Sequence, residues 1–454
     1  MKRRFLSILI CVIMLLSLTG VLTQTDSMAA SIKLSKKKIT LYVGDSVKLK
    51  LKNAKGTVKW KSSKTSVAKV SKGKVTAKKK GKATIKATYK KKTYKCTVTV
   101  KDKPFETATS AVKNMKIGWN LGNYFDATLM DMKGKSVEEF LTCWGNPIVD
   151  EAFFKKLKNL GFGAIRFPIT WAFHYDDEGN IDPKWMAKVK ETVDYILKND
   201  MYCIINMHHD TGAYNVGLPN WLFASSKNFG EQKGMYKALW KNIATAFKDY
   251  PQTLIFESFN EMVSEDDNYS DDAKAAINDY NQAFVDTVRS TGACNLNRNL
   301  ICSVYSGQAF EEGIQGFDVP QDKVKDHIIG EVHFYDPYEF TNKNSEPDIS
   351  TLGPDQEKLI DSVIDMVGKA FSSKGADKSG IPAIIGEFAT TNKNNTADRI
   401  KWFTRVITDA KKWGMPCFIW DNGMPDEMGY IDRTGGLDPF PDIIKACIDA
   451  AKKT

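Results

Sequence analysis

Cysteine and histidine are scarce in this chain, whose 454 residues include only 8 Cys and 5 His. No two cysteines have a CxxC spacing, so the sequence contains neither a zinc-site motif nor a recognisable disulfide framework. Cys203, Cys302 and Cys417 lie inside apolar runs, where a thiol behaves as a small buried hydrophobic group. We therefore predict a fold that depends on a hydrophobic core, with no metal and no cofactor.

Long apolar runs are missing beyond the first residues of the chain. Lys2-Arg3-Arg4 precedes a mostly apolar run over residues 5–18, and small residues around Met28 suit cleavage by a signal peptidase. The run is shorter than the ~20 residues that a membrane-spanning helix needs. We predict that residues 1–30 are a signal peptide and that the mature protein is secreted and extracellular, with association to the cell surface left open.

Acidic residues are almost absent from residues 31–103, which hold 25 Lys but only Asp45 and Asp102 and carry a net charge of +23. Residues 104–454 carry a net charge of −14. Such asymmetry indicates two bodies with different surfaces, so we predict domains at 31–103 and 104–454.

The basic segment alternates apolar and polar residues at 39–43, 46–51 and 83–87, with glycines between these runs. This period of two predicts a small all-β sandwich. The stretch from Trp60 to Ile85 resembles the bacterial immunoglobulin-like group 2 domains, which implies a spacer or a cell-surface adhesion module.

The lysines themselves allow several interpretations. They can form a solvated face, bind an anionic surface such as a bacterial cell wall, or dock onto the acidic half of the chain. Nucleic acid is disfavoured as a partner because the protein is predicted to be exported, and we expect a monomer.

Apolar strand-like runs alternate with amphipathic helical segments from residue 104 onward. One predicted helical face carries Ile277, Tyr280, Phe284 and Val288, and Gly414 stands where a later helix is expected to stop. Eight strands, each followed by a helix, predict an α/β fold of the (β/α)8 TIM-barrel class. The predicted strands cover residues 116–119, 164–167, 202–207, 254–259, 300–304, 328–333, 383–388 and 416–420.

Polar and ionisable side chains gather where these strands end, which is where a (β/α)8 barrel carries its chemistry. The groups are Asn120, Arg166, His208, His209, Asn260, Glu261, His333, Tyr335, Glu387 and Trp420. Glu261 and Glu387 are expected to face each other across the barrel mouth. Two such carboxylates, one protonated and one ionised, are what glycoside hydrolysis requires. We expect Arg166 to keep Glu387 ionised, and His333 and the neighbouring charge of Glu387 to help keep Glu261 protonated.

Ordered motifs from residue 110 to 450 resemble glycoside hydrolase family 5, nearest its fourth subfamily of cellulases and xyloglucanases. The motifs are Ile117-Gly118-Trp119-Asn120-Leu121-Gly122-Asn123, Cys143-Trp144-Gly145-Asn146-Pro147, Ile165-Arg166-Phe167-Pro168, Met207-His208-His209, Phe259-Asn260-Glu261, His333-Phe334-Tyr335 and Gly386-Glu387-Phe388.

The resemblance implies a retaining mechanism with Glu261 as general acid/base and Glu387 as nucleophile. It also implies that Asn260 binds the sugar 2-hydroxyl and that Trp420 lies under the sugar at the cleavage point. The roles implied for Asn120, Arg166, His208, His209, His333 and Tyr335 are to bind substrate or support the glutamates.

Two residues depart from this family pattern. Met262 replaces the usual proline after the acid/base glutamate, which puts the stiffness of that loop in question. Glu331 stands where a small residue is usual and would add a third acid near the site if it faces inward, with an effect on the pH profile whose direction stays open. Glu257, close to Glu261, is expected to be a structural acid with a basic partner inside the barrel.

Other functions fit these residues less well. His208-His209-Asp210 could suggest a metal site, but neighbouring side chains on a strand point to opposite faces, which disfavours shared ligation. The leading prediction is an endo-acting β-1,4-glucanase acting on cellulose-like β-glucan. The alternatives are a xyloglucanase, mixed-linkage glucanase, mannanase or xylanase with the same machinery, and a non-catalytic carbohydrate-binding surface protein.

Overall fold

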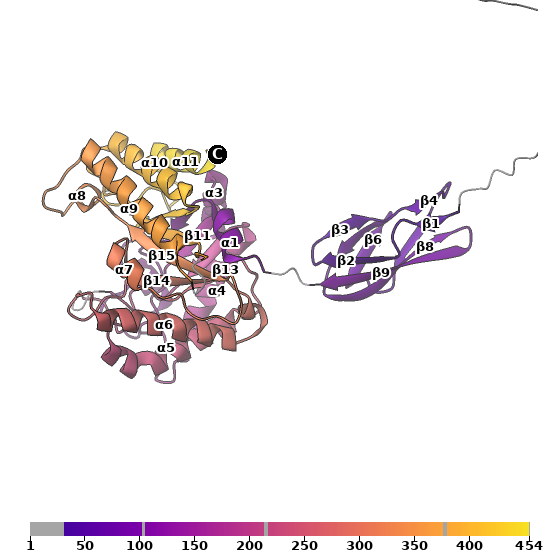
Figure 1. The fold of residues 1–454 in the computed structure, drawn as a ribbon, viewed down its shortest axis with the longest axis horizontal. Helices are drawn as coiled ribbons and strands as arrows, with labels where there is room; N and C mark the ends of the chain where they lie inside the picture. The colour runs from indigo at the N-terminus through magenta and orange to yellow at the C-terminus, as the bar shows by residue number, and fades with distance from the viewer. Residues whose placement is uncertain (1–30, 102–104, 213–216, 376–378, 454) are drawn as a thin grey trace, which may run out of the picture. The chain divides into compact units, whose positions relative to one another are not determined.

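The computed structural model describes residues 31–101, 105–212, 217–375 and 379–453, and the predicted signal peptide lies outside them. The chain divides into two compact units, Met1–Pro104 and Phe105–Thr454 (Figure 1). In the described parts of both units, no helix combines the length and the apolar character needed to cross a membrane.

The first unit is the predicted β-sandwich. A four-stranded sheet in the order β2-β9-β8-β5 and a three-stranded sheet in the order β3-β7-β6 are accompanied by the short pair β1-β4. The strands are β1 (Lys33–Leu34), β2 (Lys38–Tyr42), β3 (Ser46–Lys48), β4 (Leu51–Lys52), β5 (Lys59–Ser62), β6 (Ala68–Ser71), β7 (Lys74–Ala77), β8 (Gly81–Tyr89) and β9 (Lys92–Lys101).

Alternation along the strands separates the core of this unit from its surface. In β8, Ala83, Ile85 and Ala87 are buried, whereas Lys82 and Lys86 between them are exposed. Every described lysine of the unit is exposed. The charge therefore lies entirely on the outside of a small apolar core.

The second unit is the predicted (β/α)8 barrel. Eight parallel strands close on themselves in chain order, from β10 to β17, with β10 pairing β17. Their bounds are β10 (Gly118–Asn120), β11 (Ala164–Phe167), β12 (Tyr202–Ile205), β13 (Leu254–Glu257), β14 (Leu300–Gln308), β15 (Ile328–Phe334), β16 (Ala383–Phe388) and β17 (Cys417–Ile419). Cys203, Cys302 and Cys417 are buried on these strands, as expected.

Helices surround the barrel strands (Figure 1). In α6 (Asp271–Ser290), the Ser270 side chain accepts from Ala273 N at the amino end, and the predicted apolar face is buried. Helix α10 (Thr396–Lys412) stops just before Gly414, whose φ of +72° few other residues adopt. The remaining helices are α1 (Ala108–Met115), α2 (Val137–Thr142), α3 (Glu151–Leu160), α4 (Pro183–Lys198), α5 (Ser226–Ala246), η1 (Ala293–Leu296), α7 (Glu311–Gly316), α8 (Tyr338–Thr341), α9 (Pro354–Ser372) and α11 (Pro441–Lys452).

Helix α1 packs against a ring of barrel side chains in a separate apolar cluster. Val112 and Met115 of the helix join Ile204, Ile255 and further residues from other strands in this cluster. The helix comes so close that a Cβ on Gly163 would lie 2.3 Å from the carbonyl oxygen of Met115. This packing involves the start of β11, whereas the predicted site residues lie at the strands' carboxyl ends.

Candidate active site

Arg166 organises the centre of the barrel mouth. It lies on β11 and is fully buried. Its Nε and Nη2 donate to the two carboxylate oxygens of Glu257, each at 2.7 Å. Nη1 donates to Glu387 Oε1 at 2.6 Å and to Asn120 Oδ1 at 3.0 Å, and Nη2 also donates to Asn260 Oδ1 at 2.8 Å. All five guanidinium N–H groups are therefore used, which fixes the orientations of two acids and two amides.

Glu257 is the structural acid that the sequence predicts. It is fully buried, and its basic partner is Arg166 in a two-point ion pair. A third donor, Asn206 Nδ2, reaches Glu257 Oε1 at 2.8 Å. The three donors compensate a carboxylate that would otherwise be costly to bury.

Glu387, at the end of β16, is held at both oxygens. Arg166 binds Oε1, and the Tyr335 hydroxyl donates to Oε2 at 2.9 Å. Burial, together with the charge of Glu261, raises the pKa of Glu387, while His333 and Arg166 act in the opposite direction. Arg166 thus favours the ionised carboxylate, as expected, but burial outweighs the guanidinium in the net shift of the Glu387 pKa.

Glu261 follows β13 and has a side chain that is 42% exposed at the mouth. Its Oε1 lies 2.7 Å from His333 Nδ1. Burial acts to raise the pKa of Glu261, but the hydrogen bond and the charge of His333 lower it overall. His333 thus favours an ionised Glu261, and the expectation that it keeps this group protonated is wrong for the free site. The directions of the two pKa shifts favour the shared proton on the imidazole.

The two glutamates lie close together. One carboxylate oxygen of each, with one ring nitrogen of His333, falls within 4.8 Å of the others. His333 Nδ1 is 2.7 Å from Glu261 Oε1 and 3.7 Å from Glu387 Oε2. Retaining glycosidases separate their carboxyl groups by roughly 5–5.5 Å and inverting ones by roughly 6.5–9.5 Å. An oxygen-to-oxygen approach within 4.8 Å lies nearer to the retaining range than to the inverting one.

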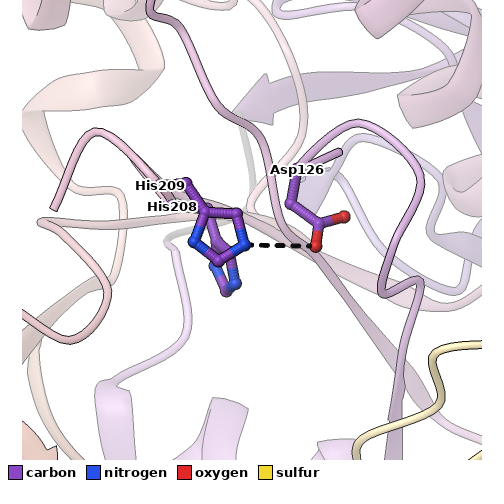
Figure 2. Close-up of side chains that lie close together, drawn as sticks. All are labelled: Asp126, His208 and His209. Atoms are coloured by element: carbon purple, nitrogen blue, oxygen red, sulfur yellow. Dashed lines mark ion pairs between the residues drawn. The ribbon is translucent and has the colours of Figure 1, made fainter. Parts of the chain in front are cut away.

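His208 and His209 differ from expectation in their placement. Strand β12 ends at Ile205, so both residues lie beyond the alternating part of the strand. Their rings contact each other at 4.6 Å between centroids, and His209 Nε2 approaches Asp126 Oδ2 at 3.8 Å (Figure 2). The three side chains present ligand atoms within 4.8 Å, so the argument that neighbouring histidines point apart is wrong.

The hydrogen bonds of His208 nevertheless disfavour a metal at this cluster. Asn206 Oδ1 accepts from Ile169 N, so its Nδ2 is the atom that faces His208 Nδ1 at 3.2 Å. His208 Nδ1 must then accept, and Nε2 carries the proton of the neutral ring. Burial lowers the pKa of His208 well below its usual range. Neither nitrogen offers the free lone pair that a metal ligand needs.

Aromatic side chains flank these polar groups. Trp420 follows β17 and stacks on His208 with ring centroids 5.6 Å apart and planes 5° from parallel. Trp144 approaches His209 with centroids 5.5 Å apart. Trp221 donates from Nε1 to Asp210 Oδ1 at 2.8 Å. Flat, partly exposed rings beside carboxylates suit the apolar faces of sugars.

The structure shows where the two residues that depart from the family pattern lie. Met262 is fully buried, and its carbonyl oxygen accepts from Ser306 N at 2.9 Å, so packing holds the chain where proline is absent. Glu331 on β15 faces inward and contacts both Arg166 and His333. Asn206 is the supporting residue that sequence reasoning missed, although a polar residue near the end of an apolar strand run was a signal for it.

Carboxylates this close, at the carboxyl-terminal mouth of a (β/α)8 barrel, define the class of glycoside hydrolases. Residues 128–425 match the family described as cellulase (glycosyl hydrolase family 5), and residues 28–100 match the bacterial Ig-like domain (group 2). The chain belongs to glycosyl hydrolase family 5. The resemblances predicted from the motifs of both units are confirmed.

Known relatives agree with this assignment. Endoglucanase A of Clostridium longisporum is 36% identical over 358 residues, which cover 76% of this chain and 66% of that protein. A solved GH5-4 broad specificity endoglucanase from the same organism has a TM-score of 0.71 and 33% identity, covering 77% of this chain and 99% of that one. A family 5 enzyme of Prevotella bryantii B14, solved with a xyloglucan tetradecasaccharide, has a TM-score of 0.68 and 31% identity, covering 76% and 99%.

Proposed function

We propose that the protein is a secreted, endo-acting, retaining β-1,4-glucanase. The observation that carries this proposal is the pair of glutamates within 4.8 Å of each other at the barrel mouth, one clamped by Arg166 and Tyr335 and the other open to a substrate. The relatives named endoglucanase support the substrate class.

In the first step, a Glu387 oxygen attacks the anomeric carbon as the glycosidic bond breaks. Glu261 gives its proton to the departing oxygen, so a covalent glycosyl ester and a free chain end form. The proton held on His333 Nδ1 can pass to Glu261 along the 2.7 Å hydrogen bond. His333 therefore supplies the protonated state of Glu261 that the free site does not favour.

In the second step, Glu261 takes a proton from water, the water oxygen bonds to the anomeric carbon, and the Glu387 ester breaks. Esterification removes the charge of Glu387, and with it a cause that would raise the pKa of Glu261. The same carboxylate can thus act as an acid first and as a base afterwards.

Neighbouring side chains orient the sugar in this proposal. Arg166 binds the amide oxygen of Asn260, so the Asn260 NH₂ group is left for the 2-hydroxyl. His208 Nε2 carries a proton and is a donor for a second hydroxyl. Trp420 provides the flat surface under the ring.

Xyloglucan is the second candidate substrate, because a similar enzyme was solved with a xyloglucan oligosaccharide. New reducing ends should be measured on β-1,4-glucan, xyloglucan, mixed-linkage glucan, mannan and xylan. We expect the strongest release from an unbranched β-1,4-glucan. Activity confined to mannan or xylan would contradict the proposal, and higher activity on xyloglucan would favour the second candidate.

We also propose that the lysine-rich unit holds the protein on anionic polymers of a bacterial cell wall. On the outer face of its four-stranded sheet, Lys61 pairs with Lys86 and Lys86 pairs with Lys95 across neighbouring strands. Like charges directly opposite one another destabilise a sheet. An anionic partner would neutralise this row, and the paired lysines therefore support the proposal.

Replacing Lys61, Lys86 and Lys95 with threonine should weaken retention on isolated walls and reduce its salt dependence. Replacing the exposed Lys36, Lys64 and Lys79 removes the same charge elsewhere and is the control. If both triple variants lose retention equally, retention depends on net charge and not on this row of lysines. If neither variant loses retention, wall binding is refuted. Amino-terminal sequencing of protein from the culture medium tests secretion and cleavage near residue 30.

A further inference from the structure

Glu331 is a buried acid to which the proposed mechanism gives no role. It lies on β15, two residues before His333, and is fully buried. Its Oε2 accepts a hydrogen bond from Ser303 Oγ at 2.8 Å. Its Oε1 has no donor in bonding geometry among the described residues, although Arg166 Nε is 3.3 Å away and His333 Nε2 is 3.6 Å away.

Arg166 cannot supply the missing hydrogen bond. The single proton on its Nε already points to Glu257 Oε2 at 2.7 Å, and its other four protons are used by Glu257, Glu387 and the two amides. The donor left for Glu331 Oε1 is the N–H of His333 Nε2. A hydrogen bond between them requires this 3.6 Å distance to shorten to about 3 Å.

His333 therefore lies between two carboxylates, with Glu261 at Nδ1 and Glu331 at Nε2. The backbone has been adapted to this arrangement. A Cβ on Gly386 would lie 1.8 Å from Glu331 Oε1, so the neighbouring strand leaves room for the acid only because it carries glycine there.

We propose that Glu331 is a positioning residue that keeps the proton of His333 on Nε2, so that Nδ1 exchanges its proton with Glu261 alone. This inference rests on the proposed function. With Nε2–H fixed, a neutral His333 presents its lone pair to a protonated Glu261, and a charged His333 donates to an ionised Glu261. Both states are needed in one catalytic cycle.

Several charged or titratable groups face this unit from the elements packed around it. The groups are Arg166 from β11, His208 after β12, Glu257 and Glu261 from β13 and its loop, Cys302 from β14, Tyr335 after β15 and Glu387 from β16. Burial acts to lower the pKa of His333, but the surrounding carboxylates raise it to about 10. Removing one of those carboxylate charges must lower the pH at which His333 loses its proton.

The test is the pH dependence of kcat/KM for three proteins: wild type, Glu331→Gln and Glu331→Asp. The Gln variant keeps the shape and loses the charge, and its high-pH limb should fall by about one pH unit or more, because the lost charge lies close to the ring in a buried site. The Asp variant keeps the charge, and its limb should stay nearer to that of wild type. A limb unmoved in Glu331→Gln, with kcat/KM lowered equally at every pH, would overturn the proposal and leave Glu331 as a structural counter-charge.

A second measurement, on the wild-type protein, tests the proposal even if the variants fail to fold. The chain has only 5 His, so ¹⁵N-histidine NMR of the wild-type protein gives few resonances. We expect Nε2 of His333 to stay protonated between pH 5 and pH 9, and an unprotonated Nε2 would overturn the proposal. This readout needs no turnover, whereas an inactive wild-type protein would refute the proposed function alone.

Discussion

Replacing Arg166 with methionine tests how much of the barrel depends on one buried cation. The change leaves Glu257, Glu331 and Glu387 buried without their shared partner. Breaking a buried ion pair by removing one member costs about 3–5 kcal/mol. Because Glu257 loses both of its 2.7 Å bonds and Glu387 loses a 2.6 Å bond, we expect a loss at the upper end of that range.

The loss should depend on pH in a defined direction. Without Arg166, the folded-state pKa values of the three carboxylates rise, because burial raises all three and the guanidinium charge that opposes it is gone. The folded variant therefore binds more protons than its unfolded state above about pH 4. Its deficit relative to wild type should be largest at pH 7–8 and should shrink as the pH falls toward 5.

Denaturant unfolding followed by tryptophan fluorescence measures this deficit, since nine of the ten Trp lie in residues 105–454. Arg405→Met is the matched control. Arg405 pairs with Glu357 and Asp361 but is 31% exposed, and its loss should cost below about 1 kcal/mol. Equal costs for the two variants, or an Arg166→Met deficit that does not vary with pH, would refute this account of the barrel centre.

Three further predictions concern the site and its surroundings. Glu387→Gln should remove nearly all turnover while polymer binding persists, and Glu261→Ala should lower kcat by roughly 10²–10⁴-fold on substrates with poor leaving groups; wild-type kinetics for either would exclude the assigned role. Gly386→Ala should destabilise the protein by about 1–3 kcal/mol through the clash with Glu331, and a Glu331→Ser background should relieve that cost in a double-mutant cycle. Burial lowers the pKa of His174 to about 3, whereas the unfolded state keeps the usual value of about 6.5, so the unfolded state binds more protons between these pH values and stability should fall as the pH drops from 6.5 to 3. His174→Phe should flatten this slope in denaturation measured at several pH values. An unchanged slope would contradict the assignment of the pH dependence to His174.

The sequence predicts the architecture well because hydrophobic periodicity and the order of polar strand ends are local features. The segment at Ala164–Phe167 is a strand with the predicted bounds, and so is Ala383–Phe388. Strands β12 and β13 end two residues earlier than predicted, because their inward polar residues leave the ladder to form the mouth. The local amino-acid composition does not show where a strand stops pairing through backbone hydrogen bonds and side-chain hydrogen bonds take over.

For the site, too, the sequence predicts some features and not others. The positions of Glu261, Glu387 and Arg166 follow from the strand ends, and a basic partner for a buried Glu257 follows from desolvation cost. The direction of each pKa shift does not follow, because it depends on which of several carboxylates the one guanidinium and the one imidazole reach. The opposite-face argument for His208 and His209 fails because it assumes that the strand continues through them.

The stereochemistry of the first product tests the central claim most directly. Proton NMR of a β-1,4-glucan digest, recorded before mutarotation, shows which anomer the enzyme releases. Attack by Glu387 and then by water inverts the anomeric carbon twice, so the β-anomer should appear first. Initial release of the α-anomer would mean a single displacement and would contradict the roles of Glu387 as nucleophile and Glu261 as acid/base.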